Sequence, residues 1–473
     1  MRLATFLTAL IGVGLLACSG GAPTQSNPAP NIEAKGDSRV LRSTPTITAD
    51  PTSAPTATLV AEPTPAPTAT LVADPTPDPV PVATYSFSTE PSSTKLTNGF
   101  STKSKKFGTS VAIDGDTIIS GDPNDLFGGT DSGSASVFNI SNDTWIQQAE
   151  ITADDFYQGY LFGGAVDIDG DTAVIGATGG AKGAVYVSVL SNGIWNQQAK
   201  LVDIATDSSA KFGQSVAISG DTIVIGAPTD DAPETDSGSA FVFTRTGDVW
   251  TKAAQLSASG RIYTLSNNKF GESVAIDSDR IYVGALGDFS TNGTDSGAAY
   301  VFTLSDGTWV EEAKLHASDG VQGDNFGRSI SVFNDTLVVG APGVDDNGTD
   351  SGATYIFVRN DIGEWDEEAK LIASNGGYED NFGWSVAVEA DVAIVGALYA
   401  NAPASDSGSI YTYDRTGTKW AERSILAGND TTSNDRLGTS VAISGNVAVA
   451  GAPGYMDIAK ETGAIHVFTG QLR

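Results

Sequence analysis

Acidic side chains supply nearly all of the chemistry that this sequence offers. The 473 residues contain 57 Asp and Glu against 26 Lys and Arg, with two His and one Cys, so the formal net charge is −31. Such a surface repels nucleic acids and anionic lipids. A single cysteine excludes disulfide scaffolds, cysteine-rich zinc sites and thiol catalysis in the body of the protein. The two histidines, His316 and His466, are expected to be hydrogen-bonded polar groups within strands.

Many of the carboxylates cluster in loops of similar sequence. The tripeptide Asp-Ser-Gly closes a loop at Asp131, Asp236, Asp295, Asp350 and Asp406. An aspartate that recurs in this way is expected to form a turn rather than bind a ligand. Oxygen ligands of the kind these loops offer are those that calcium prefers, and open loops without a preformed cage bind it weakly, on the order of 10⁻⁴ to 10⁻³ M. The candidate calcium ligands are Asp230, Asp231, Asp345, Asp346 and Asp350.

The loops belong to a repeated unit. KFGQSVAISGDTIVIGAP at 211–228 returns as NFGRSISVFNDTLVVGAP at 325–342, and the units begin near residues 107, 162, 212, 270, 326, 382 and 437. Regular spacing of this size is typical of a repeat architecture. Each unit contains short apolar runs separated by tight polar turns and by the acidic loops. Four such strands per unit predict an all-β fold, a seven-bladed β-propeller of four-stranded blades.

The seventh unit stops before its fourth strand. In the six other units a tryptophan opens that strand, but in the last unit the equivalent position falls beyond the end of the sequence. Lys95 precedes Phe107 by the same twelve residues that separate Lys200 from Phe212. A segment at about residues 92–97 is therefore expected to supply the missing strand and close the ring, since an open strand edge invites association.

An export signal and a stalk are expected before the propeller of residues 91–473. Residues 1–17 contain an apolar run shorter than the roughly 20 residues that span a bilayer. The sequence Leu-Leu-Ala-Cys, ending at Cys18, resembles the lipobox of bacterial lipoproteins. Residues 18–90 are rich in Pro, Thr and Ala and predict a disordered, lipid-anchored linker. We expect a membrane-anchored protein of the cell envelope, on the outer membrane or cell surface; an ordinary signal peptide is the alternative.

The stretch FGQSVAISGDTIVIGAP, followed by TDSGSAFVF, resembles the FG-GAP repeat family in its short bacterial form, over all seven units. The resemblance implies a propeller similar to the one that heads integrin α-subunits, whose upper surface binds protein ligands and whose blades often hold calcium. The calcium loop of that family is longer than the turns found here. Asp167, Asp169 and Asp171 imitate only its beginning and are expected to form an ordinary turn.

Residues that break the repeat are the candidate ligand contacts, because one ligand rarely has sevenfold symmetry. Trp384 replaces the Thr, Gly, Gln, Glu or Arg of the other blades. Tyr378 and Tyr399 lie nearby in the sequence, and Tyr455 belongs to the next blade. Aromatic faces stack on sugar rings or anchor proteins; core packing is the alternative. With no catalytic motif, we expect a binding or adhesion module for an extracellular or periplasmic protein or glycan. A polysaccharide-processing enzyme and a purely structural envelope protein stay open as alternatives.

Overall fold

A computed structural model describes residues 92–99, 106–126, 128–180, 182–203, 209–231, 234–259, 267–288, 296–401, 403–428, 430–457 and 460–470. These residues belong to one compact unit, Thr84–Arg473. The expected signal peptide, Cys18 and the whole of the expected linker, residues 18–90, lie outside the described residues.

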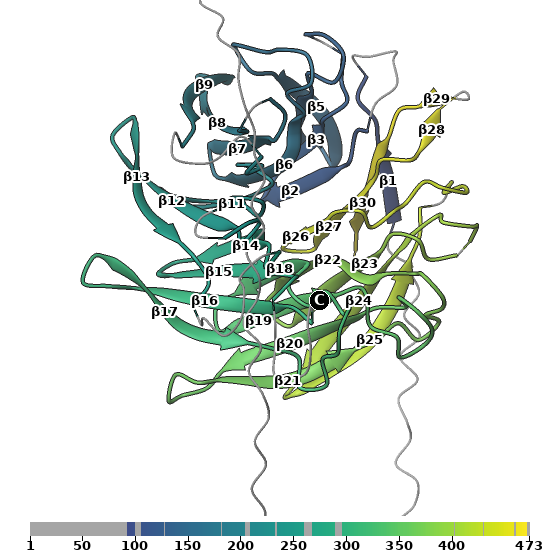
Figure 1. The fold of residues 1–473 in the computed structure, drawn as a ribbon. Coiled ribbons are helices and arrows are strands. Elements are labelled where there is room, and N and C mark those ends of the chain that lie inside the picture. Colours follow the sequence, from purple (N-terminus) through teal and green to yellow (C-terminus); the bar gives the residue numbers. More distant parts are fainter. Residues whose placement is uncertain are drawn as a thin grey trace, which may run out of the picture. The chain divides into compact units, whose positions relative to one another are not determined.

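Six blades are four-stranded antiparallel sheets whose strands follow one another in sequence (Figure 1). Blade 1 comprises β2 (Ser110–Asp114), β3 (Thr117–Asp122), β4 (Ser134–Ser141) and β5 (Thr144–Ile151), and blade 2 comprises β6 (Phe162–Asp169), β7 (Thr172–Ala177), β8 (Ala184–Ser191) and β9 (Ile194–Leu201). Blade 3 comprises β10 (Ser215–Ser219), β11 (Thr222–Ala227), β12 (Ser239–Thr246) and β13 (Val249–Leu256), and blade 4 comprises β14 (Phe270–Asp277), β15 (Arg280–Ala285), β16 (Ala298–Ser305) and β17 (Thr308–Leu315). Blade 5 comprises β18 (Ser329–Phe333), β19 (Thr336–Ala341), β20 (Ala353–Arg359) and β21 (Trp365–Leu371), and blade 6 comprises β22 (Phe382–Glu389), β23 (Val392–Ala397), β24 (Ser409–Thr416) and β25 (Lys419–Leu426).

The seventh blade is assembled from both ends of the described chain. It contains β26 (Val441–Ser444), β27 (Val447–Ala452), β30 (Ala464–Thr469) and, as its outermost strand, β1 (Ser92–Leu96), which lies beside β30 in Figure 1. The antiparallel register runs from Ser92↔Thr469 to Leu96↔Ile465. A short hairpin, β28 (Met456–Asp457) and β29 (Lys460–Glu461), projects from this blade. The predicted all-β, seven-bladed propeller of four-stranded blades is confirmed.

The Phe-Gly pair joins each blade to the one before it. Its phenylalanine, or Leu437 in blade 7, makes a parallel bridge to the glycine of the preceding blade, and Phe107↔Gly463 makes the same contact across the ring closure. The side chain is buried between two sheets; the ring centroid of Phe162, for example, lies 5.2 Å from that of Tyr186. The following glycine cannot carry a side chain, because a Cβ on Gly163 would lie 2.3 Å from a backbone oxygen of the neighbouring blade. The motif is thus a packing device between blades.

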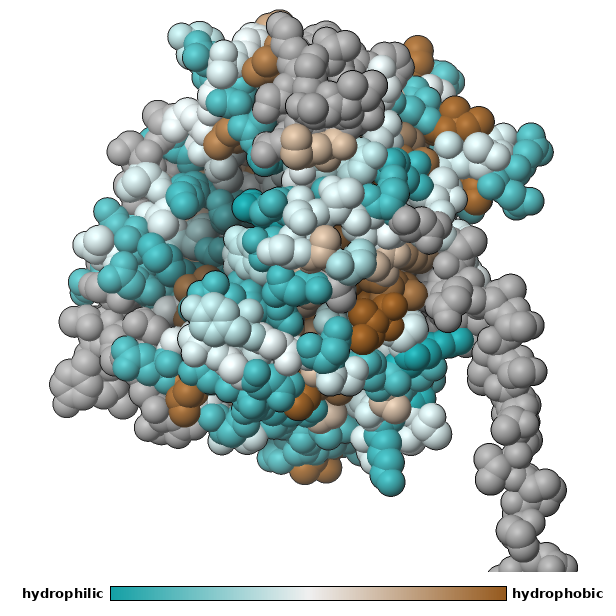
Figure 2. Space-filling view, turned by 90° about the vertical axis from the view of Figure 1, so that its right-hand side faces the viewer, coloured by the Kyte–Doolittle hydropathy of each residue, from teal (hydrophilic) through white to brown (hydrophobic). Residues whose placement is uncertain are grey.

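The tryptophans link the outermost strands of neighbouring blades. In four blades the indole Nε1 donates a hydrogen bond to a Gln or Glu three residues after the tryptophan of the preceding blade. The pairs are Trp195 to Gln148 (3.0 Å), Trp250 to Gln198 (2.8 Å), Trp365 to Glu312 (3.2 Å) and Trp420 to Glu368 (2.9 Å). These tryptophans hold the rim of the ring together. On the side shown in Figure 2, hydrophilic residues predominate and hydrophobic ones lie singly or in small groups.

Candidate functional site

The long loops of the propeller emerge together on one face, which we call the loop face. In blade 1 the turns that join β2 to β3 and β4 to β5 are tight, and antiparallel pairing places both at the opposite end of the blade, on what we call the turn face. On the loop face, backbone hydrogen bonds join neighbouring loops: Leu161 N donates to Asp131 O (3.0 Å), and Asn381 N donates to Asp350 O (3.0 Å). The loop face is therefore braced, in the sense that backbone hydrogen bonds hold neighbouring loops in fixed positions relative to one another.

The aspartate of each described Asp-Ser-Gly sequence shapes this bracing. Its φ lies between 51° and 55° at Asp131, Asp236, Asp350 and Asp406, which is the left-handed region that Asp adopts more readily than most residues. That conformation directs the carbonyl toward the next blade, where it accepts the bonds described above. The backbone gives these residues the turn-forming role that their recurrence suggested; Asp295 lies outside the described residues.

The calcium candidates fall in two separate blades, and those of blade 3 are engaged by the protein itself. Asp230 is 2% exposed, and its Oδ2 accepts a hydrogen bond from the Ser239 hydroxyl (2.6 Å). Asp231 Oδ1 accepts one from Asp236 N (2.9 Å), and the Asp236 carboxylate pairs with Lys269 (3.0 Å). Each of these carboxylates already has a structural partner.

Blade 5 carries a less compensated group of acids. Asp345 Oδ1 accepts a hydrogen bond from Asp350 N (2.9 Å), and Asp346 pairs with Lys370 (2.6 Å). Burial raises the pKa of Asp350, and the charges of Asp345 and Glu379 raise it further. Within the described ranges no three His, Cys, Asp or Glu side chains gather as a metal site. Calcium binding stays a prediction.

The four aromatic candidates do not form a single platform. Among the described residues no ring contact joins any two of them, and three stack on cations of the chain itself. The pairs are Arg328 over Trp384 (4.1 Å from guanidinium carbon to ring centroid), Arg436 over Tyr399 (5.5 Å) and Lys95 over Tyr455 (4.2 Å to the ammonium nitrogen). Tyr378 is 63% exposed on its loop. It is the candidate whose ring is most available to a partner.

Three side chains form a row at the loop-face ends of the first strands of blades 4, 5 and 6. In each blade this first strand is the innermost one, nearest the axis of the propeller. Glu272, Arg328 and Trp384 hold the same position after the Phe-Gly pair in blades 4, 5 and 6. Arg328 Nη1 lies 3.5 Å from Glu272 Oε1, and the guanidinium covers the indole of Trp384. The repeat-breaking tryptophan therefore completes an interaction between three blades.

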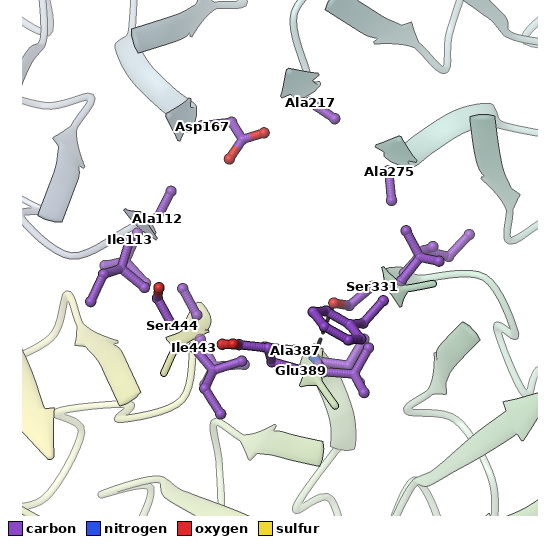
Figure 3. A pocket seen from close by; sticks show the side chains of 18 of the residues that line it. Ala112, Ile113, Asp167, Ala217, Ala275, Ser331, Ala387, Glu389, Ile443 and Ser444 are labelled. Atoms are coloured by element: carbon purple, nitrogen blue, oxygen red, sulfur yellow. Dashed lines mark hydrogen bonds between the residues drawn. The ribbon is translucent and has the colours of Figure 1, made fainter. Parts of the chain in front are cut away.

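A central channel of about 480 Å³ runs along the inner strands (Figure 3). One position of each strand points into it, and in six blades that residue is small. The residues at this position in the seven blades are Ala112, Asp167, Ala217, Ala275, Ser331, Ala387 and Ala442. The strands crowd toward the axis, which explains the small side chains. Asp167 is the exception, and its carboxylate projects into the opening in Figure 3.

Asp167 is held by backbone groups of two blades. Its Oδ1 accepts a hydrogen bond from Ile168 N (2.9 Å) and its Oδ2 accepts one from Ile218 N (2.8 Å). Burial raises the pKa of Asp167 to about 7, against the effect of these two bonds and together with the charges of Asp169 and Asp114. The carboxyl group therefore changes its charge near neutral pH.

Replacing Asp167 by Asn is expected to flatten the pH dependence of stability between about pH 4 and pH 7. Because the pKa of Asp167 is higher in the folded chain than in the unfolded chain, protonation favours folding, and this stabilisation is lost as pH rises through 7. Chemical denaturation of both proteins at pH 5 and pH 8 measures the effect. The variant should lose less stability between the two pH values than the unaltered chain; equal losses would show that Asp167 is not responsible.

A buried tyrosine, a lysine and an aspartate recur together in several blades. In blade 2 the Tyr186 hydroxyl donates to Asp155 Oδ1 (2.8 Å), and Lys200 pairs with Asp155 Oδ2 (2.6 Å). Blade 7 has His466 at the tyrosine position, opposite Lys95. His466 is 1% exposed, and neither ring nitrogen has a hydrogen-bond partner in the described part of the chain. The expectation of a hydrogen-bonded histidine was wrong here, because the shorter side chain stands where tyrosines reach an acceptor.

Replacing His466 by Tyr is expected to stabilise the protein, most strongly below pH 6. Burial lowers the pKa of His466 to about 4. Between about pH 4 and pH 6.5 the histidine is therefore protonated in the unfolded chain but neutral in the folded chain. The resulting loss on acidification amounts to about 3 kcal/mol. The tyrosine hydroxyl is expected to reach Asp430, as Tyr186 reaches Asp155.

Urea denaturation at pH 5 and pH 8 tests the histidine, with His466→Phe as the control that removes the titrating ring without adding a hydroxyl group. Both variants should lose the acid sensitivity, and only the tyrosine variant should also gain stability at pH 8. Unchanged acid sensitivity in both variants would contradict the assignment.

The comparisons with known proteins place these features in a family. The model of the family described as FG-GAP repeat matches residues 93–138, 145–188, 195–243, 250–302, 309–357, 365–413 and 420–468, which together make up more than half of the chain. Each match after the first starts at or beside the tryptophan of one blade and ends in the third strand of the next, and the first match starts within β1. No curated protein matches the chain.

Proposed function

The chain belongs to the FG-GAP repeat family, and on this premise we propose that it is a binding or adhesion module of the cell envelope whose loop face takes a protein or glycan partner. The family fold supports a binding role in general. The observation that carries the proposal for this chain is the braced loop face: backbone bonds between neighbouring loops fix their positions before a partner arrives, which lowers the entropy cost of binding.

A polysaccharide-processing enzyme is the second candidate, and Asp167 is the observation that favours it. A carboxyl group with a pKa near 7 inside a channel has the property expected of a general acid. Two backbone N–H groups hold its two oxygens, however, and proton transfer to a substrate would disturb both bonds. We therefore favour binding without turnover. Release of shortened glycans by the unaltered chain, abolished in Asp167→Asn, would reverse this preference.

Membrane attachment through Cys18 is part of the proposal and rests on the sequence. The part of the chain that the structure describes contains no candidate membrane-spanning helix. Changing Cys18 to Ser is expected to move the protein from the membrane fraction to the soluble fraction, because acyl chains on this residue are the proposed anchor. Cell fractionation followed by detergent-free washing measures the shift. Retention of Cys18→Ser in the washed membranes would refute the lipid anchor.

Weak calcium binding is proposed for the loop of blade 5. The clustered charges of Asp345, Asp350 and Glu379 attract cations, and a bound ion would relieve the repulsion that raises the pKa of Asp350. Melting curves in calcium, with magnesium at equal ionic strength as the control, test this part. A rise in melting temperature specific to calcium, reduced in Asp345→Asn, supports it; equal shifts with both ions indicate screening alone.

The proposed function is tested by screening the full chain against a glycan array and for adhesion to cells, with and without calcium. Retention of a defined set of glycans or of one cell type supports the proposal. Absence of specific binding in both assays would favour the purely structural alternative.

A further inference from the structure

Blade 2 lacks the long loop that the other described blades carry between their second and third strands. Six residues, 178–183, join β7 to β8, whereas eleven residues, 342–352, join β19 to β20 in blade 5. The short loop has the sequence TGGAKG and contains neither the Asp-Ser-Gly turn nor any acid. Gly179 N donates to Tyr160 O (2.9 Å), so the short loop is fixed against the loop that enters the blade.

The missing loop leaves the ion pair of Lys200 and Asp155 without a cover on the loop face. In blade 5 the Tyr355 hydroxyl and Lys370 both bind Asp319, and Asp346 from the long loop covers the lysine with a second ion pair of 2.6 Å. Blade 2 repeats the first part of this arrangement with Tyr186, Lys200 and Asp155, as described above. It has no residue in the position of Asp346.

A pocket of about 160 Å³ occupies the uncovered space. Lys200 and the buried Tyr186 contribute to its lining together with Tyr160, Val202 and Lys182. Pockets for drug-sized molecules run from roughly 300 Å³ upward. This one therefore has room for a single ring rather than for a chain of them.

The lining combines aromatic, apolar and cationic surfaces. Lys200 Nζ lies 5.4 Å from the ring centroid of Tyr160 and 5.2 Å from that of Tyr186. Tyr157, which is 68% exposed, stands beside Tyr160 with 6.1 Å between ring centroids, and Val202 is 48% exposed. Among the described residues that line the pocket, Lys182 and Lys200 are charged and none is acidic. On a chain with a net charge of −31, this is an unusual setting.

Burial lowers the pKa of Lys200, but hydrogen bonds to Asp155 and Tyr186 outweigh burial and raise it above the ordinary value of 10.5. The ammonium group is therefore charged at every physiological pH. It offers hydrogen-bond donors to a ligand while Asp155 anchors it, so the donor is held in place before binding.

We propose that this pocket of blade 2 binds a single sugar ring that carries a carboxylate, such as a uronic acid unit of an acidic polysaccharide. The C–H face of such a ring stacks on the ring of Tyr160, its carboxylate lies near the lysine ammonium groups, and its hydroxyls accept from Lys200. A phosphate or acetate ion has no face to place against the aromatic wall. The inference rests on the proposed function in one respect only, that the loop face is the surface that binds a partner.

Titration of the full chain with glucuronic acid, glucose and acetate, followed by ligand-observed NMR, tests the proposal. Glucuronic acid is expected to bind, glucose at least about tenfold more weakly because the charge-assisted hydrogen bonds are lost, and acetate not measurably. Equal binding of glucose would overturn the role of the carboxylate. Equal binding of acetate would show attraction to the lysines alone and would overturn the sugar site.

Two variants and one matched control locate the binding. Tyr160→Ala, on a partly exposed loop, and Lys200→Met should each weaken glucuronic acid binding about tenfold. Lys370→Met removes the equivalent lysine of blade 5, so it controls for stability and should leave binding unchanged. Undiminished binding in Tyr160→Ala would overturn the site even if Lys200→Met proved unstable. Loss of this site would leave adhesion by other parts of the loop face intact, so its failure is distinguishable from failure of the proposed function.

Discussion

Deleting residues 19–98 is expected to destabilise the propeller by several kcal/mol and to make it self-associate. The deletion removes β1, which pairs along its whole length with β30 and buries Leu96 at the junction of blades 7 and 1. It also removes Lys95, which binds Asp430 and whose Nζ lies 2.5 Å from the Tyr455 hydroxyl. The edge of β30 would then present unpaired backbone groups to other molecules.

The matched control deletes residues 19–85 and keeps β1. Its melting temperature should equal that of the unaltered chain, and light scattering should show a monodisperse protein. The longer deletion should melt lower and give larger particles. Identical melting temperatures for the two deletions would contradict the closing role of β1.

Replacing Phe382 by Ala is expected to cost about 3–5 kcal/mol of folding free energy. Phe382 is fully buried between blades 5 and 6, with its ring centroid 5.2 Å from that of Tyr411 and 6.0 Å from that of Tyr413. Truncation leaves a cavity that the stiff sheets cannot collapse into. Denaturant unfolding monitored by tryptophan fluorescence measures the loss.

Blade 7 provides the control for this substitution, because Leu437 stands there in place of phenylalanine and is also fully buried. Phe382→Leu should therefore cost less than about 1.5 kcal/mol. If the alanine and leucine variants were equally stable, the packing role assigned to the Phe-Gly pair would be wrong.

The architecture was predictable because its signals are local and repeated. The Phe-Gly pairs, the tight turns and the tryptophans each recur at similar offsets, so the strand pattern of one blade predicts that of the others. The position of Lys95 relative to Phe107 placed a closing segment near residues 92–97, and the structure has β1 at Ser92–Leu96 paired with β30.

The contacts of the candidate site residues were not predictable in the same way, because they join different blades. Trp384 breaks the repeat in sequence, but its partner Arg328 lies one blade away, and nothing local indicates that pairing. Lys200 is uncovered because the β7–β8 loop of blade 2 is short. This is recognised only by comparison with blade 5, where Asp346 of the longer loop pairs with the equivalent Lys370. A shortened loop adds no unusual residue to the sequence, so it gives no local signal of a site.

Binding of the partner at the loop face is measured by the adhesion assay, with large exposed side chains truncated on one face at a time. Tyr378→Ala with Val321→Ala alters the loop face, and Ile194→Ala with Val249→Ala alters strand ends next to the turn face; all four side chains are more than half exposed. The first pair of substitutions is expected to reduce binding severalfold, and the second pair is expected to leave binding unchanged. Loss of binding in the second pair alone would contradict binding at the loop face.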